Sequence, residues 1–122
     1  MSPALDENAL PALLGRDPVR LCRVYRLYLD TCAKSMAKLE AVVSRGELVA
    51  IKASAHTLKS SSYMVGAIAL GDLCASMEDA ADCGDVKRME ALLPSLLESA
   101  DAALKWVREQ IGRIEESSSS AS

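Results

Sequence analysis

Apolar residues recur at intervals of three and four positions along most of this chain, which is the spacing that places them on one side of an α-helix. Stretches with this spacing cover residues 18–45, 47–65, 67–83 and 86–111. Gly46, Gly66 and Gly84 follow the first three stretches, and glycine is the residue most typical of the position just past a helix end. The pattern therefore predicts four long amphipathic helices joined by short loops.

Signals for helix starts precede several of these stretches. Asp17-Pro18 combines an N-cap residue with a proline at the first helical position, and Asp85 can cap the last helix. Asp6 can cap a short additional helix over residues 7–14, which Gly15 ends. We expect this short segment to form a lid on the bundle.

The stretch 47–65 shows which side of its helix faces the core. Six of its residues fall within an arc of roughly 100° at 3.6 residues per turn: Leu48, Ile51, Ala55, Leu58, Ser62 and Val65. Ser62 is interpreted as structural, with its hydroxyl bonded back to the Leu58 carbonyl. In the last stretch, Pro94 removes one backbone hydrogen bond, so we expect a kink or a break between Leu92 and Pro94.

Short connections between long helices force sequence neighbours to pack antiparallel. The predicted fold class is all-α, an antiparallel four-helix bundle with a short N-terminal cap helix. We assign residues 1–114 to this domain. Residues 115–122, which end in SSSSAS, show no apolar periodicity and are predicted to form a disordered tail.

Composition and charge narrow the function classes. Half of the residues are hydrophobic and only 3% are aromatic, which favours helices over strands. A net charge of −3, with no run of Lys and Arg, argues against nucleic-acid binding. No apolar stretch approaches the roughly 20 residues that a membrane span needs, and no signal peptide begins the chain, so we expect a cytoplasmic protein without membrane insertion.

The four cysteines are scattered along the chain without a CxxC pair. Three of them lie on or near apolar helical stripes, where cysteine behaves as a small hydrophobic residue. We expect reduced, structural thiols and no metal site, because the spacings form no zinc finger.

His56 is the chain's single histidine, and it lies roughly 130° from the centre of the apolar arc on its helix. It is therefore predicted to be exposed beside the core stripe. Lys52, Lys59, Ser60 and Tyr63 project from the same helical surface. Two ammonium groups favour the neutral, nucleophilic imidazole and can afterwards attract phosphoryl oxygens. Alternatively, the lysines are ordinary solvated residues, and Tyr63 is either a packing residue or a partner contact.

Residues 55–80, AHTLKSSSYMVGAIALGDLCASMEDA, resemble the signature of the histidine-containing phosphotransfer (HPt) family. That signature has His, Leu, Lys, a stretch of small residues, Gly-Ala, Leu, Leu-Cys and an apolar residue followed by Glu. The resemblance covers roughly residues 5–112. It implies that His56 is the phosphoacceptor and Lys59 a supporting cation. It places Gly66-Ala67 at the turn between helices and the rest of the signature along the following helix, namely Leu70, Leu73, Cys74, Met77 and Glu78. Gly66, Ala67, Leu70 and Leu73 are assigned a structural role.

One position departs from the family pattern. The family usually has glycine directly after the lysine, where this chain has Ser60. A hydroxymethyl group there either narrows the space beside the imidazole or donates a hydrogen bond to phosphate.

The resemblance implies a phosphorelay carrier without its own nucleotide site, not an enzyme. Its expected partners are receiver domains of response regulators and a hybrid sensor histidine kinase, and we expect a monomer. No intrinsic cofactor is expected, and magnesium is expected in the partner receiver domain. The predicted docking surface combines the His56 face with the neighbouring helix 18–45, and Tyr63 and Met64 are candidate partner contacts.

The residues around His56 also bear on two rival functions. The phosphoacceptor helices of a sensor kinase usually follow histidine with an acidic residue and a downstream proline, whereas this chain reads His-Thr-Leu-Lys. A phosphorylation-independent adaptor that binds a receiver or kinase stays open. The acidic residues Glu78, Asp79 and Asp82 are interpreted as a solvated helix face.

Overall fold

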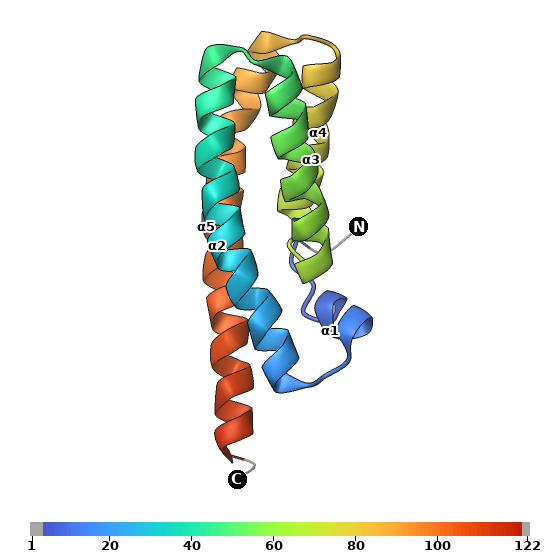
Figure 1. Cartoon of the computed structure of the whole chain (residues 1–122), viewed down its shortest axis with the longest axis vertical. Coiled ribbons are helices and arrows are strands. Elements are labelled where there is room, and N and C mark those ends of the chain that lie inside the picture. Colours follow the sequence, from blue (N-terminus) through green and yellow to red (C-terminus); the bar gives the residue numbers. More distant parts are fainter. Residues whose placement is uncertain (1–3, 121–122) are drawn as a thin grey trace.

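The computed structural model describes residues 4–120, which form five α-helices and no strand (Figure 1). The helices are α1 (Ala9–Leu14), α2 (Pro18–Arg45), α3 (Leu48–Val65), α4 (Ile68–Asp82) and α5 (Val86–Ser120). Helices α2 to α5 run antiparallel to their sequence neighbours, and α5 returns to pack against α2 as well as α4. The expected all-α four-helix bundle with a cap helix is confirmed. None of the described helices is both long enough and apolar enough to cross a bilayer.

The predicted caps of α2 and α5 are present with their contacts, whereas the N-cap residue of α1 is Asn8 and not the predicted Asp6. The Asp17 carboxylate accepts a hydrogen bond from the Val19 N–H at 3.2 Å, with Pro18 at the first helical position. Gly46 ends α2 in the left-handed conformation, at φ 66°. At the start of α5, the Asp85 carboxylate accepts from the Arg88 N–H at 3.1 Å. These caps satisfy backbone groups that a helix terminus leaves unpaired.

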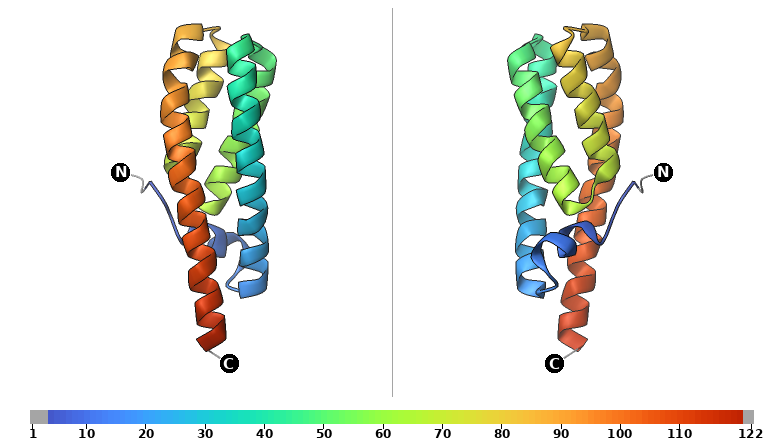
Figure 2. Two further views of the ribbon diagram at one scale, coloured as in Figure 1. Left: turned by 90° about the vertical axis from the view of Figure 1, so that its left-hand side faces the viewer. Right: turned by 90° about the vertical axis from the view of Figure 1, so that its right-hand side faces the viewer.

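Helix α1 lies below the end of α3 and beside the first turns of α2 (Figures 1 and 2). It begins at Ala9, slightly later than expected, and the Asp6 carboxylate accepts from the Asn8 N–H at 3.0 Å. Leu10 is fully buried, as a lid residue should be. The Asp6 N–H also donates to the Gly66 carbonyl at 2.8 Å, and a Cβ on Gly66 would collide with the Asp6 carbonyl oxygen. Gly66 therefore ends α3 and also leaves room for the backbone of Asp6 to pack against it.

Two expectations about the core of α3 are wrong. Leu48 is 39% exposed at the end of the bundle, while Ser54 is buried. Ser62 is fully buried as predicted, but its hydroxyl pairs with the Tyr28 hydroxyl of α2 at 2.9 Å instead of the Leu58 carbonyl. A neighbouring helix offers a better partner than the Ser62 helix itself, because a buried tyrosine hydroxyl also needs a hydrogen bond.

Helix α5 differs from expectation at two places. It runs without a break from Val86 to Ser120 with Pro94 inside it, so of the expected kink or break the break is absent. It also stays helical beyond residue 114, and Glu115 forms an ion pair with Arg26 of α2. The division into a domain at 1–114 and a tail at 115–122 stays a prediction.

The cysteines are free thiols, as predicted, and three of the four are buried. Cys22, Cys32 and Cys74 line the apolar core, whereas Cys83 is exposed. Burial raises the pKa of Cys74 to about 12 and also raises the pKa of Cys22 and Cys32. The buried thiols therefore stay protonated at neutral pH and unreactive.

Candidate functional site

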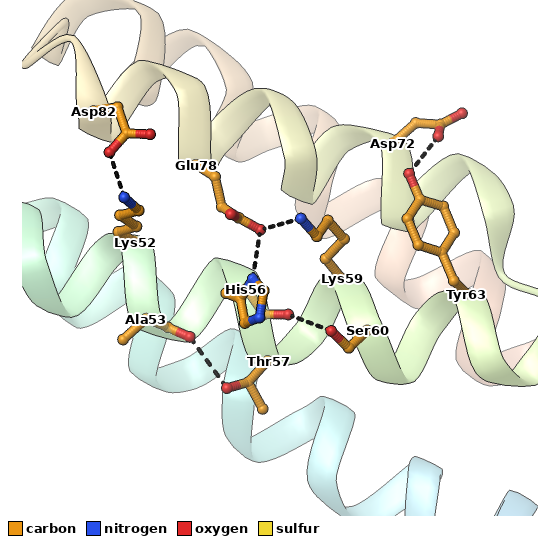
Figure 3. Close-up of polar contacts among 10 residues, drawn as sticks. All are labelled: Lys52, Ala53, His56, Thr57, Lys59, Ser60, Tyr63, Asp72, Glu78 and Asp82. Atoms are coloured by element: carbon orange, nitrogen blue, oxygen red, sulfur yellow. Dashed lines mark hydrogen bonds and ion pairs between the residues drawn. The ribbon is translucent and has the colours of Figure 1, made fainter.

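The polar residues that sequence analysis grouped around His56 lie along the edge where α3 meets α4 (Figure 3). On α3 these are the donors Lys52, His56, Lys59 and Tyr63. Carboxylates of α4 face them across the edge, namely Asp72, Glu78 and Asp82. We call this set of seven side chains the α3–α4 edge.

His56 stands on the outer side of this edge, with 64% of its side chain exposed. Its Nδ1 atom lies 3.4 Å from Oε1 of Glu78. The other ring nitrogen, Nε2, has no ion-pair or hydrogen-bond partner among the described residues. The prediction of an exposed histidine is confirmed, and one of its nitrogens lies near a carboxylate.

Glu78 is shared between two basic side chains. The Nζ atom of Lys59 lies 2.9 Å from the same Oε1 atom that faces His56. The Glu78 side chain is only 14% exposed and that of Lys59 only 26%. Removing a carboxylate from water is unfavourable unless a cation lies nearby, so the Lys59 ammonium group offsets part of the cost of burying Glu78 beside the imidazole.

Lys52 does not act on His56 directly. Its Nζ atom lies 2.7 Å from Oδ1 of Asp82, and both side chains are 53% exposed. The hydrogen bond to Asp82 raises the pKa of Lys52. Each of the two lysines that sequence analysis placed beside the imidazole therefore has a carboxylate partner on α4.

Ser60 is adjacent to the site along the helix but its hydroxyl points at the backbone. Its Oγ atom donates to the His56 carbonyl oxygen at 3.1 Å, and the Thr57 hydroxyl donates in the same way to the Ala53 carbonyl at 3.1 Å (Figure 3). In this arrangement Ser60 does not contact the imidazole through a hydrogen bond.

Tyr63 lies at the end of the α3–α4 edge that is nearer the turn between the two helices. Its hydroxyl donates to Oδ1 of Asp72 at 2.6 Å, and this hydrogen bond, the largest contribution, raises the pKa of Tyr63 to about 12. The next residue, Met64, is 39% exposed. Both side chains thus reach the surface within about two helical turns of His56.

A family model for the Hpt domain matches residues 23–116. The chain belongs to the Hpt family. The fold also matches the crystal structure of histidine-containing phosphotransfer protein B (HptB) from Pseudomonas aeruginosa PAO1, with a TM-score of 0.84 and 21% identity over 93% of this chain and 98% of that one. No curated protein sequence matches this chain.

Membership in the Hpt family establishes the class of activity as histidine phosphotransfer within two-component relays. Hpt domains are phosphotransfer carriers that work with receiver domains and kinases, and they have no nucleotide site of their own. The predicted fold, family and relay function are therefore confirmed at this level.

Within this Hpt domain, sequence analysis missed the position of Glu78. Glu78 was interpreted as part of a solvated helix face, and that interpretation is wrong because its side chain is only 14% exposed and lies against His56 and Lys59. Asp82 is 53% exposed, as expected of a solvated face, and also pairs with Lys52. Asp79 is exposed as expected. The sequence order of these pairs is that of two antiparallel helices: as the residue number of the α3 donor increases, the residue number of its α4 partner decreases. That pairing was not visible without knowing which sides of the two helices meet.

The residues of the predicted structural motif lie at and after the turn between α3 and α4. Ala67 and Leu70 are buried and Leu73 is half-buried against the core. Gly66 has the left-handed conformation, at φ 97°. Together these residues set the direction of α4 after the turn and thus the position of Glu78. Among residues 4–120, no three His, Cys, Asp or Glu side chains are grouped as a metal site requires.

Proposed function

We propose that His56 is the phosphoacceptor, which takes a phosphoryl group from an aspartyl phosphate on one receiver domain and passes it to the receiver of a response regulator. The observation that carries this proposal is that a histidine phosphotransfer domain needs an accessible imidazole, and His56 is the chain's single histidine. Its side chain is 64% exposed.

The contact with Glu78 supports a defined tautomer. A carboxylate 3.4 Å from Nδ1 favours the proton on that nitrogen, which leaves the lone pair on Nε2, toward solvent. In the transfer step Nε2 attacks phosphorus, the bond between phosphorus and the aspartyl oxygen breaks, and the aspartate leaves as a carboxylate. The ring gains positive charge as the new bond forms, and Glu78 stabilises that charge as the carboxylate of a catalytic triad does.

Lys59 supports the phosphoryl group once it is on the ring. Its ammonium group is already near the imidazole through their shared partner Glu78. A phosphoryl group carries negative charge that attracts this ammonium, so Lys59 rotates partly from Glu78 toward the phosphoryl oxygens. Ser60 can redirect its hydroxyl from the His56 carbonyl to the same oxygens. Lys52, held by Asp82, adds long-range attraction only.

The docking surface in this proposal is the exposed side of α3 around His56 together with the adjoining side of α2. Met64 and Tyr63 supply apolar area there, at 39% and 37% exposure. The receiver brings the acceptor aspartate and its magnesium ion. We further propose a hybrid sensor kinase as the source of the phosphoryl group, a monomeric carrier and a cytoplasmic location, where such receivers work.

Intact-mass measurement tests the acceptor. Wild type and His56→Gln are incubated with magnesium and a panel of receiver domains charged with acetyl phosphate. We expect an acid-labile gain of about 80 Da, one phosphoryl group on one nucleophile, in the wild type alone. The same gain in His56→Gln would overturn the assignment. No gain with any receiver, together with retained binding and an intact fold, would favour a phosphorylation-independent adaptor.

A further inference from the structure

The ring of Tyr63 is held against α4 from two directions. Its hydroxyl donates to Asp72 at 2.6 Å, as Figure 3 shows. Its ring lies directly over Gly71, where an added Cβ would be 2.9 Å from Cζ and closer still to two other ring carbons. Gly71 does not have a positive φ. The absence of a side chain at position 71 therefore leaves room for the ring and relieves no backbone strain.

This arrangement is costly for a residue that is not in the core. Glycine inside a helix is less favourable than alanine, because it loses more backbone freedom on folding. The Tyr63 side chain that it accommodates stays 37% exposed, whereas the core tyrosine Tyr28 is 2% exposed. Burial alone offsets the cost of Gly71 less well for Tyr63 than it would for a core ring. A local cost without a matching gain in packing is typical of a functional position.

Tyr63 lies where a partner that reaches His56 must also make contact. It follows His56 by seven residues and Lys59 by four, so it is about two turns and one turn away on the same side of α3. A standard protein interface buries about 800 Å² on each partner, which extends well beyond two helical turns. A ring that is already fixed loses little conformational entropy when it is bound.

We propose that Gly71 and Asp72 of α4 are positioning residues that hold the Tyr63 ring as a rigid contact for receiver domains. This contact helps to set which receivers bind productively over His56. The inference rests on the proposed function of His56 and adds to it a specificity element that α4, and not α3 alone, determines.

Transfer kinetics with phosphorylated receiver domains test this inference. Initial rates of phosphoryl transfer to His56 are measured against receiver concentration for wild type, Gly71→Ala, Asp72→Ala and Tyr63→Ala. We expect the half-saturating receiver concentration to rise about fivefold or more in each variant, the usual range for a displaced interface tyrosine. The saturated rate should stay within about twofold of wild type, because Gly71 and Asp72 contact none of His56, Lys59 and Glu78.

A double-mutant comparison separates this role from a structural one. In the Tyr63→Ala background no ring remains for the new methyl group to displace, so Gly71→Ala should cause no further change in half-saturation. An equal shift in both backgrounds, or a fall confined to the saturated rate, would overturn the proposal. If Gly71→Ala alone unfolds, Asp72→Ala and Tyr63→Ala make the same comparison. Failure of the proposed function has a different signature, because wild type would then gain no phosphoryl group on His56.

Discussion

The α3–α4 edge and the contact between α2 and α5 belong to one bundle but use different chemistry. Across α2 and α5, buried Tyr25 meets Trp106 edge to face, with ring centroids 6.5 Å apart and an interplanar angle of 84°. Across the α3–α4 edge, lysine, histidine and tyrosine meet carboxylates, and their side chains are between 14% and 64% exposed in the ion pairs. Apolar burial stabilises a fold far more than exposed ion pairs do. Both helix pairs also bury apolar core residues. The comparison therefore separates an aromatic contact, which serves stability alone, from a polar edge where the proposed phosphoacceptor stands.

The largest expected effect on stability is on the α2–α5 side. Tyr25→Ala removes a ring that is 2% exposed and leaves a cavity against Trp106. We expect the free energy of unfolding to fall by about 3–5 kcal/mol in urea titrations. Phosphoryl transfer per folded molecule should be unchanged, and a parallel loss of transfer would show that the two sides are coupled.

The largest expected effect on transfer is at Glu78. Glu78→Gln keeps the size of the side chain but removes the charge that lies beside Nδ1 of His56 and pairs with Lys59. We expect transfer to His56 to slow by about 10- to 100-fold, the range known for carboxylate partners of metal-bound histidines. Asp79→Asn, one residue further along α4 and exposed, is the matched control and should leave the rate unchanged. Equal effects in the two variants would mean that Glu78 acts only through net charge.

A moderate effect on stability alone is expected inside the bundle at Tyr28. Tyr28→Phe leaves the fully buried Ser62 hydroxyl without its 2.9 Å partner. We expect a loss of about 1–3 kcal/mol in the free energy of unfolding, because a buried hydroxyl stays desolvated and unpaired. Ser62→Ala should restore part of the loss in the double variant. If the losses of the two single variants simply add in the double variant, the hydrogen bond between Tyr28 and Ser62 makes no contribution to the free energy of unfolding.

The hydrogen bond between Tyr63 and Asp72 predicts a pH dependence at the alkaline end. The pKa of Tyr63 is raised to about 12 from 10, so the folded protein keeps a proton that the unfolded chain releases. The resulting stability is fully present below pH 10 and is lost as the pH rises toward 12. Comparing Tyr63→Phe with wild type by urea unfolding at pH 8, 10 and 11.5 should show their difference shrinking as the pH rises. A constant difference would contradict this assignment.

The smallest effect is expected at Lys52. Its contact with Asp82 joins two half-exposed side chains, and such surface pairs contribute about 0–1 kcal/mol. Lys52→Ala should therefore change the free energy of unfolding by less than about 0.5 kcal/mol and transfer by less than about twofold. A strong loss of transfer in this variant, measured beside Lys59→Ala, would move Lys52 into the group that contacts the phosphoryl oxygens.

Much of the fold and the position of His56 could be predicted because they follow from local rules. The caps at Asp17 and Asp85, the helix end at Gly46 and the exposure of His56 each depend on residues within about one helical turn. The errors share a different origin. They concern the exposure of Leu48, the partner of Ser62 and the partners of Glu78. Each of these depends on which neighbouring helix packs against that position.

The amino-acid sequence by itself determined the number and class of the helices, their caps, and the single histidine at which a phosphotransfer domain can act. Only the tertiary structure decided that Glu78 faces both His56 and Lys59, and that Tyr63 is held over Gly71. The physical reason is that helical periodicity specifies which side of a helix is apolar, whereas contacts between helices depend on their relative rotation and register. Those two quantities are set by the packing of the whole bundle.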